Sequence, residues 1–380
     1  MRHRVLMVTN NYQPYAGGVV QSVRASRDAL RQRGHDVIIA TLDFRGSEPE
    51  GGVVRLFSPV CFAYRTNQMA IAWQATRQLR ALVDDYTPTI IHTHHPFLLG
   101  MAAYTVARSC NLPVVFTHHT LYDRYLHYAP LPAWITKPIV MQRVAAYCRQ
   151  VDAVVAPTAF VQQCIAESYG IEESRISVIP SALYAFEQTA LSKRLGSPLE
   201  LITVSRFTPE KRVHLLLDVL TLLRAHYPAL SWRMRIVGYG YLESELKHYA
   251  YATCRLSSDQ VLFITPQSRD ALRMLYDESH LFLFASQSET QGLVLAEALA
   301  CGLPTLALCG PAIEDTVAHE VTGMVVNSCE ELADAIASLS ADRIRYERFS
   351  ASALSAATRY GLAQHGDLLI SVYNSVIKNS

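Results

Sequence analysis

The chain has 380 residues, half of them hydrophobic and 18% charged, which excludes a disordered or fibrous protein and suits two domains of ordinary size. The net charge of +1 gives no indication of a nucleic-acid partner. Residues 1–190 nevertheless carry 17 Lys and Arg against 13 Asp and Glu. This excess either reflects chance or suits contact with an anionic surface.

The cysteines and the apolar runs indicate the compartment. None of the eight cysteines forms a C-x-x-C pair and several lie in apolar runs, so we expect free thiols in a reducing compartment. The first eight residues hold too short an apolar run for a signal peptide, and no run approaches the ~20 apolar residues that span a bilayer. We therefore expect a cytoplasmic protein that touches a membrane, if at all, from the inner face of the plasma membrane.

Strands and helices alternate along the first half of the chain. The first four expected elements are a strand at Val5–Thr9, a glycine-bearing loop at Asn10–Gly18, a helix at Val20–Arg33 and a strand at Asp36–Thr41. Later strands are expected at Val53–Phe57, Thr89–His92, Pro113–Thr117, Ala153–Ala156 and Ile176–Ile179, and later helices at Asn67–Asp84, Leu98–Ser109, Lys137–Gln150 and Ala159–Tyr169. This order predicts a doubly wound parallel sheet.

A linker is expected over residues 181–198, where the periodicity is lost. A second alternating series begins at Leu199–Val204 and ends in a mostly helical segment, Arg343–Ile377. The fold class is therefore α/β, with one domain in residues 1–185 and a second in residues 198–359. Because open parallel sheets bind ligands at the carboxyl ends of their strands, two such sheets facing each other would place a site on the loops that follow strands.

Two glutamates with seven residues between them are the strongest chemical signal. Glu289 follows the expected strand Leu281–Ala285, and Glu297 lies on the next helix. Carboxylates suit sugar and ribose hydroxyls, and the helix N-terminus between them offers N–H groups to phosphate. Gly292 allows the backbone to approach a ligand closely.

Basic residues follow the first strand of the second domain. Arg206 and Lys211 lie beyond the end of that strand, before the next helix. A guanidinium fork and an ammonium group together could neutralise a leaving diphosphate without a metal ion. A basic loop paired with Glu210 is the simpler alternative.

Glycines and histidines follow strands of the first domain. Gly17 and Gly18 precede a helix and permit a tight turn with N–H groups facing a ligand. Histidines cluster at residues 92–95 and 118–119. No Asp, Glu or Cys shares these clusters, so we do not interpret them as a metal site.

Over nearly the whole chain these motifs resemble the family-4 retaining glycosyltransferases, whose GT-B fold has two facing Rossmann-like domains. The family signature is two glutamates seven residues apart, and Glu289-Thr290-Gln291-Gly292 is similar to the branch that glycosylates diacylglycerol and related membrane lipids. The resemblance implies transfer of a hexose, with retention, from a nucleotide sugar such as UDP-glucose or GDP-mannose. It implies no metal or other cofactor, and a C-terminal helix at 360–380 that packs back on the first domain.

The resemblance also implies roles for individual residues. Arg206 and Lys211 would stabilise the leaving diphosphate, Glu289 and His119 would hold the donor sugar, and Glu297 would bind the ribose. Further donor contacts are expected from Gly17, Gly18, Gly238, Thr290, Gln291, Gly292 and Leu293, and acceptor contacts from Tyr12, His118 and Tyr122. Because His118 occupies the aromatic position of the family motif, which of His118 and His119 faces the sugar stays open.

The acceptor is inferred from composition. Residues 121–143 are rich in aromatic, apolar and basic residues, which suits either a membrane interface or a packed helix. The segment resembles the lipid-glycosylating branch at Tyr122, Tyr125, His127 and Tyr128. With four arginines on an early helix (Arg24, Arg27, Arg31 and Arg33), it favours a lipid acceptor and a peripheral contact with an anionic membrane through the first domain.

Two alternatives remain. One is a glucosyl- or mannosyltransferase of exopolysaccharide or lipopolysaccharide assembly, whose activity anionic vesicles would not raise. The other is a non-catalytic nucleotide-sugar-binding protein, which would have no need of Arg206, Lys211 and both glutamates together. A dinucleotide-binding dehydrogenase is disfavoured, because the first loop lacks G-x-G-x-x-G.

Overall fold

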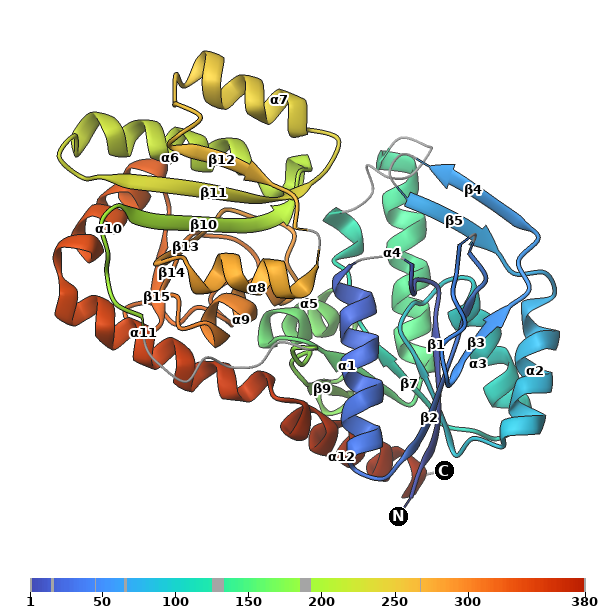
Figure 1. The fold of residues 1–380 in the computed structure, drawn as a ribbon. Coiled ribbons are helices and arrows are strands. Elements are labelled where there is room, and N and C mark those ends of the chain that lie inside the picture. The colour runs from blue at the N-terminus through green and yellow to red at the C-terminus, as the bar shows by residue number, and fades with distance from the viewer. Residues whose placement is uncertain are drawn as a thin grey trace. The chain divides into compact units, whose positions relative to one another are not determined.

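The computed structural model describes residues 2–14, 17–44, 46–64, 67–124, 133–184, 193–266 and 268–378. The chain divides into two compact units (Figure 1). Unit 1 comprises residues 1–184 and 359–380, and unit 2 comprises residues 185–358. No described helix is both long and apolar enough to cross a membrane. All eight cysteines are free thiols.

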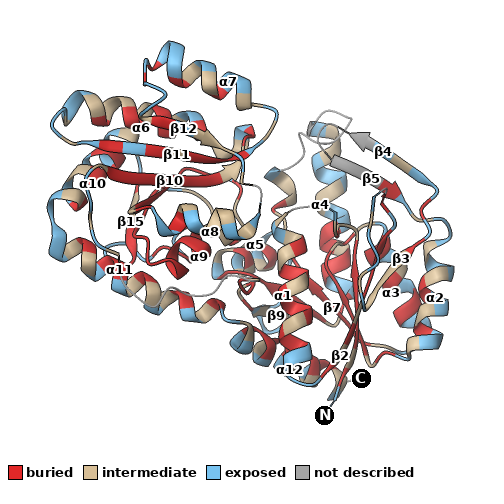
Figure 2. Cartoon of the chain, viewed as in Figure 1, coloured by how far each residue is buried: buried red, intermediate tan, exposed pale blue. Residues whose placement is uncertain are grey.

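Unit 1 is built on a seven-stranded parallel sheet in the order β3-β2-β1-β6-β7-β8-β9. Its strands are β1 (Arg4–Thr9), β2 (Asp36–Leu42), β3 (Val53–Leu56), β6 (Ile90–Thr93), β7 (Val114–Thr117), β8 (Ala153–Ala156) and β9 (Ile176–Val178). The central strands are almost wholly buried, as Figure 2 shows, because helices cover both faces of the sheet. For this reason their sequences are continuous apolar runs, without the alternation of apolar and polar residues that a half-exposed strand shows.

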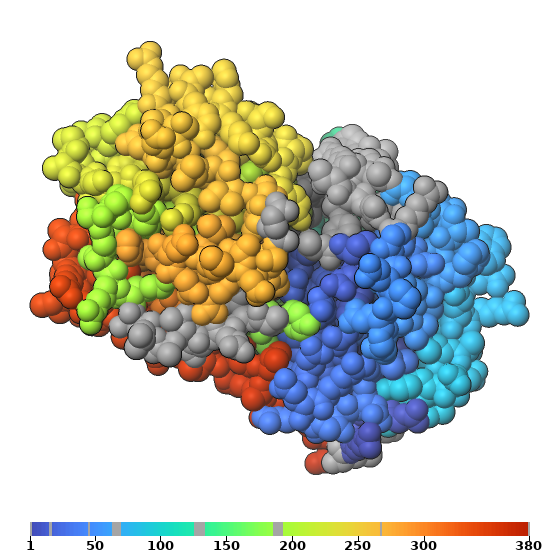
Figure 3. Space-filling view, viewed as in Figure 1, coloured from blue at the N-terminus to red at the C-terminus, as the bar shows by residue number. Residues whose placement is uncertain are grey.

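The helices of unit 1 are α1 (Gly18–Gln32), α2 (Ala75–Tyr86), α3 (Leu99–Ser109), α4 (Ala133–Gln150), α5 (Ala159–Tyr169) and α12 (Leu362–Lys378). Helix α12 comes from the end of the chain and lies against α1, as the red and blue segments in Figures 1 and 3 show. Gly366 makes this approach close, since a Cβ there would lie 3.0 Å from the Ala29 carbonyl oxygen. His3 and Asn374 join the helix to the start of β1 at 3.0 Å.

A hairpin in unit 1 corrects one expectation. Residues 67–84 were expected to form one helix, but strand β5 (Asn67–Ile71) pairs antiparallel with β4 (Val60–Tyr64), and only α2 from Ala75 is helical. The run 68–72 holds Gln, Met and Ala, which favour a helix, but pairing with a neighbouring β-rich segment outweighs this weak local preference.

Unit 2 is built on a six-stranded parallel sheet in the order β12-β11-β10-β13-β14-β15. Its strands are β10 (Leu199–Arg206), β11 (Trp232–Tyr239), β12 (Val261–Ile264), β13 (Leu281–Phe284), β14 (Thr305–Leu308) and β15 (Gly323–Val326). Its helices are α6 (Val213–His226), α7 (Glu243–His248), α8 (Arg269–Asp277), α9 (Leu293–Ala300), α10 (Cys329–Ala341) and α11 (Arg343–Ala357). Leucines of α6 and α10 pack on the sheet to form the core.

Candidate active site

The chain order of the strands in unit 2 locates a binding edge. Strand β10 is the first strand of this sheet in the chain and lies between β11 and β13. The strands β11 and β12 are added on one side of β10, and β13, β14 and β15 on the other, so the strand order reverses between β10 and β13. Open α/β sheets bind ligands at such a switch point, outside the carboxyl ends of the strands. The loops after β10 and β13 therefore form the candidate site of this unit.

Hydrogen bonds join these two loops. The Gln287 N–H donates to the Glu210 carbonyl oxygen at 3.0 Å, and the Arg212 Nε donates to the Ala285 carbonyl oxygen at 2.6 Å. Between them the Lys211 ammonium forms an ion pair with the Glu289 carboxylate, and each side chain is only 12% exposed. The structure thus brings together two of the residues that the sequence singled out.

The charges around Glu289 keep it ionised. Burial alone would raise the pKa of Glu289, but Lys211 at the shortest range, with Ser286 and Arg206, holds that pKa below its ordinary value. Arg206 ends β10, is 41% exposed, and its guanidinium lies 3.6 Å from the Glu210 carboxylate. The edge therefore combines two cations, Arg206 and Lys211, with the carboxylates of Glu210 and Glu289. Carboxylates accept hydrogen bonds from hydroxyls, and the cations suit phosphate.

The loop after β13 leads directly into a helix N-terminus. Thr290, Gln291 and Gly292 precede Leu293, the first residue of α9, and no side chain caps this helix. Gly292 has a φ of +73°, which glycine adopts without strain. The Gln291 carbonyl oxygen accepts a hydrogen bond from Thr316 Oγ1 at 3.0 Å, which fixes the loop. The first N–H groups of α9 thus lie beside Glu289, where they suit an anion.

Glu297 lies deeper than the sequence suggested. Its side chain is 8% exposed, its Oε1 lies 3.0 Å from an Arg269 guanidinium nitrogen, and the Tyr276 hydroxyl donates to its Oε2 at 3.0 Å. Burial raises the pKa of Glu297, although both partners favour the ionised form. Sequence reasoning missed Arg269 and Tyr276, because neither has a motif and each lies at least 21 positions from Glu297.

Gly238 allows the ends of β10 and β11 to approach closely. A Cβ at this position would lie 1.8 Å from the Ser205 carbonyl oxygen, and its φ is +146°. Phe207 N–H donates to the Tyr239 carbonyl oxygen at 2.8 Å, which continues the strand pairing past Arg206. The glycine therefore positions the segment that carries Arg206.

We expect Gly238→Ala to destabilise unit 2 by at least about 3 kcal/mol, because the backbone must move to relieve the overlap. Gly170→Ala is the matched control, since Gly170 also has a positive φ but no atom within 4 Å of its Cβ position. That control should cost only about 1 kcal/mol. Hydrogen exchange measured by mass spectrometry in urea follows the two units separately and measures both changes, since Gly238 lies in unit 2 and Gly170 in unit 1. Equal losses in both variants would contradict the steric explanation.

The corresponding edge of unit 1 carries histidines and the N-terminus of α1. Gly17 precedes α1 and Gly18 begins it, just after β1. His94 and His119 follow the neighbouring strands β6 and β7, and His94 Nδ1 lies 2.9 Å from His119 Nε2. Burial and the surrounding imidazoles hold the pKa of His119 well below its ordinary value, so this imidazole is neutral. Glycine N–H groups and a neutral imidazole thus lie at the same edge of the sheet.

The three residues expected to contact the acceptor lie mainly in the interior of unit 1. Tyr12 is completely buried, and its hydroxyl is 3.2 Å from both Glu50 and Arg27. His118 is 2% exposed, and its Nε2 lies 3.4 Å from the Tyr169 hydroxyl. Tyr122 stacks edge-to-face on His118. His119 is the less buried of the two adjacent histidines, so it is the better placed to meet a ligand.

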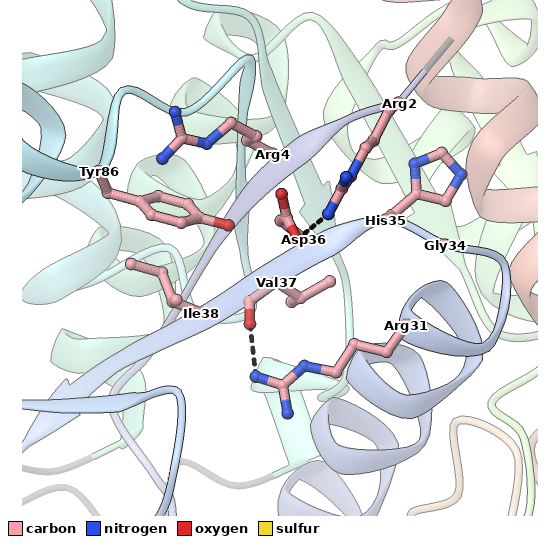
Figure 4. A pocket seen from close by; sticks show the side chains of 9 residues that line it. All are labelled: Arg2, Arg4, Arg31, Gly34, His35, Asp36, Val37, Ile38 and Tyr86. Carbon is pink, nitrogen blue, oxygen red and sulfur yellow. Dashed lines mark hydrogen bonds and ion pairs between the residues drawn. The ribbon is translucent and has the colours of Figure 1, made fainter.

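The opposite edge of the unit 1 sheet has a hollow of about 670 Å³ at the amino ends of β1 and β2 (Figure 4). Its arginines already have partners: Arg2 pairs with Asp36 at 2.7 Å, Arg4 donates to Thr87 at 2.6 Å and Arg31 donates to the Val37 carbonyl oxygen at 2.7 Å. The hollow lies at the amino ends of these strands, whereas the candidate residues follow the carboxyl ends, so the two are distinct. Within the described ranges, no three His, Cys, Asp or Glu side chains lie together as metal ligands.

Known proteins resemble the chain along both units. Residues 16–183 match the model of Glycosyltransferase Family 4, and residues 188–355 match that of Glycosyl transferases group 1. An alpha-monoglucosyldiacylglycerol synthase of Streptococcus pneumoniae is 26% identical, over 88% of this chain and 77% of its own. A D-inositol 3-phosphate glycosyltransferase of Xylanimonas cellulosilytica is 30% identical, over 76% of this chain and 72% of its own.

Solved structures share the fold at low identity. Anabaena Alr3699/HepE in complex with UDP has a TM-score of 0.75 and 15% identity, covering 98% of this chain and all of that one. A glycosyltransferase from Rickettsia africae has a TM-score of 0.74 and 17% identity over the whole of both chains. The predicted α/β class with two Rossmann-like domains is confirmed. The chain belongs to the glycosyltransferases that combine a family 4 domain with a group 1 domain.

Proposed function

We propose that this glycosyltransferase transfers a hexose from a nucleotide sugar, with retention at the anomeric carbon, to a hydroxyl of a membrane lipid such as diacylglycerol. The buried Lys211–Glu289 ion pair at the switch point of unit 2 is the observation that carries the proposal. Two relatives named alpha-monoglucosyldiacylglycerol synthase, from Streptococcus pneumoniae and Acholeplasma laidlawii, support the acceptor class.

The charges suit the chemistry of the leaving group. In the transfer, the bond between the anomeric carbon and the diphosphate oxygen breaks and a bond to the acceptor oxygen forms on the same face of the sugar. The acceptor proton passes to the departing diphosphate. Arg206 and Lys211 would stabilise the negative charge that develops there, and the N–H groups at the start of α9 would add to this.

Glu289 and His119 would hold the sugar in this proposal. An ionised, buried carboxylate accepts hydrogen bonds from hydroxyls, and a neutral imidazole can donate or accept one. A bound diphosphate would compete with Glu289 for Lys211, so that donor binding frees the carboxylate for the sugar. Glu297 would reach the ribose only by exchanging one of its bonds to Arg269 or Tyr276.

An exposed apolar surface on unit 1 supports the membrane acceptor. Phe57, Val60, Phe62, Ile71 and Trp73 are each between 47% and 62% exposed, around the β4–β5 hairpin. Val60 and Ile71 are direct cross-strand partners in the hairpin, and the Trp73 N–H donates to the Phe57 carbonyl oxygen at 3.0 Å where the two strands begin and end. The five apolar residues therefore lie on the hairpin and directly beside it. We call these five residues the hairpin patch.

The charges around the hairpin patch suit an anionic lipid surface. Residues 51–83 contain four arginines and no Asp or Glu, and Arg77 and Arg80 are exposed. Aromatic groups beside cations are typical of surfaces that bind at the membrane interface. In this proposal unit 1 brings the enzyme to the inner face of the plasma membrane.

The residues that first suggested membrane contact are placed differently. Arg27 is buried and paired with Asp28 and Glu50, and Arg33 pairs with Asp367. The Arg24 guanidinium lies 2.8 Å from the Tyr184 hydroxyl. Arg24 and Arg27 on α1, and Arg33 directly after it, therefore bond to residues of their own unit. Tyr125, His127 and Tyr128 lie outside the described residues, whereas Trp134 on α4 is 78% exposed.

The double variant Phe62→Ser/Trp73→Ser should bind anionic vesicles at least about tenfold more weakly, because it removes two apolar groups from the interface. Ile344→Ser is the control, since Ile344 on α11 is 84% exposed but belongs to unit 2. Co-sedimentation with phosphatidylglycerol vesicles measures the change. Unaltered binding by the double variant, with its thermal stability retained, would show that the hairpin patch is not the contact.

Nucleotide release tests the function. The wild-type protein is incubated with UDP-glucose, UDP-galactose or GDP-mannose, with and without vesicles of diacylglycerol and an anionic lipid. We expect release from one donor that depends on diacylglycerol, and its loss in Lys211→Met. Nucleotide release that does not depend on the lipid but requires Lys211 would indicate that the acceptor is a glycan or inositol phosphate instead of a lipid. Absence of both release and donor binding would contradict the proposal.

A further inference from the structure

Three histidines of unit 1 stack in a row near the carboxyl edge of its sheet. The ring centroids of His92 and His94 are 4.4 Å apart, and those of His94 and His119 are 5.2 Å apart. His92 and His94 are almost completely buried, and His119 is partly exposed. Only the last of the three is a candidate ligand for the donor sugar, so the other two raise the question of what they do.

The inner end of the row is fixed at both ring nitrogens. His92 Nδ1 lies 2.7 Å from the Tyr373 hydroxyl of α12, and His92 Nε2 lies 2.7 Å from Thr117 Oγ1 on β7. Tyr373 is itself completely buried and lies edge-on to the His92 ring. The C-terminal helix therefore anchors His92, and the His92 ring supports the ring of His94.

The contact between His94 and His119 shows which ring nitrogen of His94 carries the hydrogen. His94 Nδ1 and His119 Nε2 are 2.9 Å apart, so one of them carries the hydrogen. In the described part of the chain the other nitrogen of His94, Nε2, is buried and has no hydrogen-bond partner. A buried N–H without a partner is rarer than a buried acceptor without one. In the lower-energy tautomer, His94 Nε2 is therefore unprotonated and His94 Nδ1 carries the hydrogen.

We propose that His94 is a positioning residue, which donates from Nδ1 to Nε2 of His119 and thereby keeps the His119 proton on Nδ1. The imidazole then offers an N–H donor, not a lone pair, to an oxygen of the donor sugar. This role rests on the proposed function, in which His119 meets the donor. Burial lowers the pKa of His92, and lowers the pKa of His94 and His119 well below the ordinary value, so all three rings are neutral, as the assignment requires.

Two substitutions at residue 94 separate the hydrogen bond from the packing. His94→Phe keeps a planar ring against His92 but has no donor. His94→Asn loses the ring, but its amide nitrogen lies near the position of Nδ1 and can still donate to His119. The readouts are the tautomer of His119, from nitrogen-15 spectra of histidine-labelled protein assigned with His119→Asn, and the steady-state kinetics with the donor that the wild type uses.

The wild type should show His119 protonated on Nδ1. His94→Phe should move that proton to Nε2 or to a mixture of both, and should lower kcat about tenfold with the affinity for the free nucleotide unchanged, the effect of one lost hydrogen bond. His94→Asn should restore both. A wild-type His119 protonated on Nε2, or an unchanged tautomer in folded His94→Phe, would overturn the assignment.

The two proposals can fail separately. If His94→Phe does not fold, the wild-type spectrum and His94→Asn still decide the tautomer. If no variant, including the wild type, transfers a sugar, the proposed function is wrong, whereas the tautomer of His119 still tests the role of His94.

Discussion

Glu289→Gln is expected to lower the rate of sugar transfer by about 10²- to 10³-fold, and Lys211→Met by at least as much. Glu289 supplies the ionised carboxylate that would accept hydrogen bonds from the donor sugar at the switch point, and Lys211 is the cation that we expect to face the leaving diphosphate. Each single change also removes one half of an ion pair whose two side chains are only 12% exposed, which we expect to cost about 3–5 kcal/mol of stability. Initial rates and thermal unfolding of the same preparations measure both effects.

The double variant Lys211→Met/Glu289→Gln separates stability from catalysis. It removes both charges, so the free energy of unfolding should recover most of the single-variant loss. Activity should stay as low as in the worse single variant, because both groups act in one step. Recovery of activity together with stability would mean that the ion pair is structural only. A fully stable single variant with wild-type rates would contradict both roles.

Unit 1 is expected to lose stability steeply as the pH falls from about 6.5 to 4.5. Burial lowers the pKa of His92 to about 3, and the pKa values of His95, His118 and His365 to about 4. Below pH 6.5 the unfolded chain binds protons at these sites and the folded unit does not, so unfolding is favoured as the pH falls. These four groups alone give a slope of up to about 5 kcal/mol per pH unit, and His94 and His119, whose pKa values burial also lowers, add to it.

Hydrogen exchange measured by mass spectrometry between pH 7.5 and 4.5, with rates corrected for intrinsic exchange, assigns the unfolding to a unit. Unit 1 should open first, because His92, His95, His118 and His365, whose pKa values burial lowers, all lie in this unit. His365→Gln removes one titrating group and should reduce the slope by about 1.4 kcal/mol per pH unit. Protection of unit 1 that is constant down to pH 5 would contradict the prediction.

The alternation of elements and the residues after β10 and β13 could be predicted from the sequence. Buried parallel strands are short apolar runs, and their loops must carry any polar site, so Arg206, Lys211 and Glu289 were identifiable by position. The contact between Lys211 and Glu289 could not be predicted in the same way, because 78 positions separate them and only the strand order brings the loops together.

Other features depend on tertiary packing that no local pattern reports. The β4–β5 hairpin replaced the first part of an expected helix, since strand pairing outweighed local propensity. Tyr12 and His118 follow strands as site residues do, yet both side chains turn into the core of unit 1. Arg269 and Tyr276 hold Glu297 from a helix that carries no motif, so a sequence argument had no reason to select them.

The product of the reaction decides whether the protein is a retaining hexosyltransferase that acts on a lipid. Wild-type protein is incubated with the donor from which it releases nucleotide and with vesicles of diacylglycerol and anionic lipid, and the lipid fraction is analysed by proton NMR. We expect a hexosyl lipid with the anomeric configuration of the donor, formed in step with nucleotide release and absent with Glu289→Gln. Nucleotide release without a glycosylated lipid, or a product with inverted configuration, would contradict it.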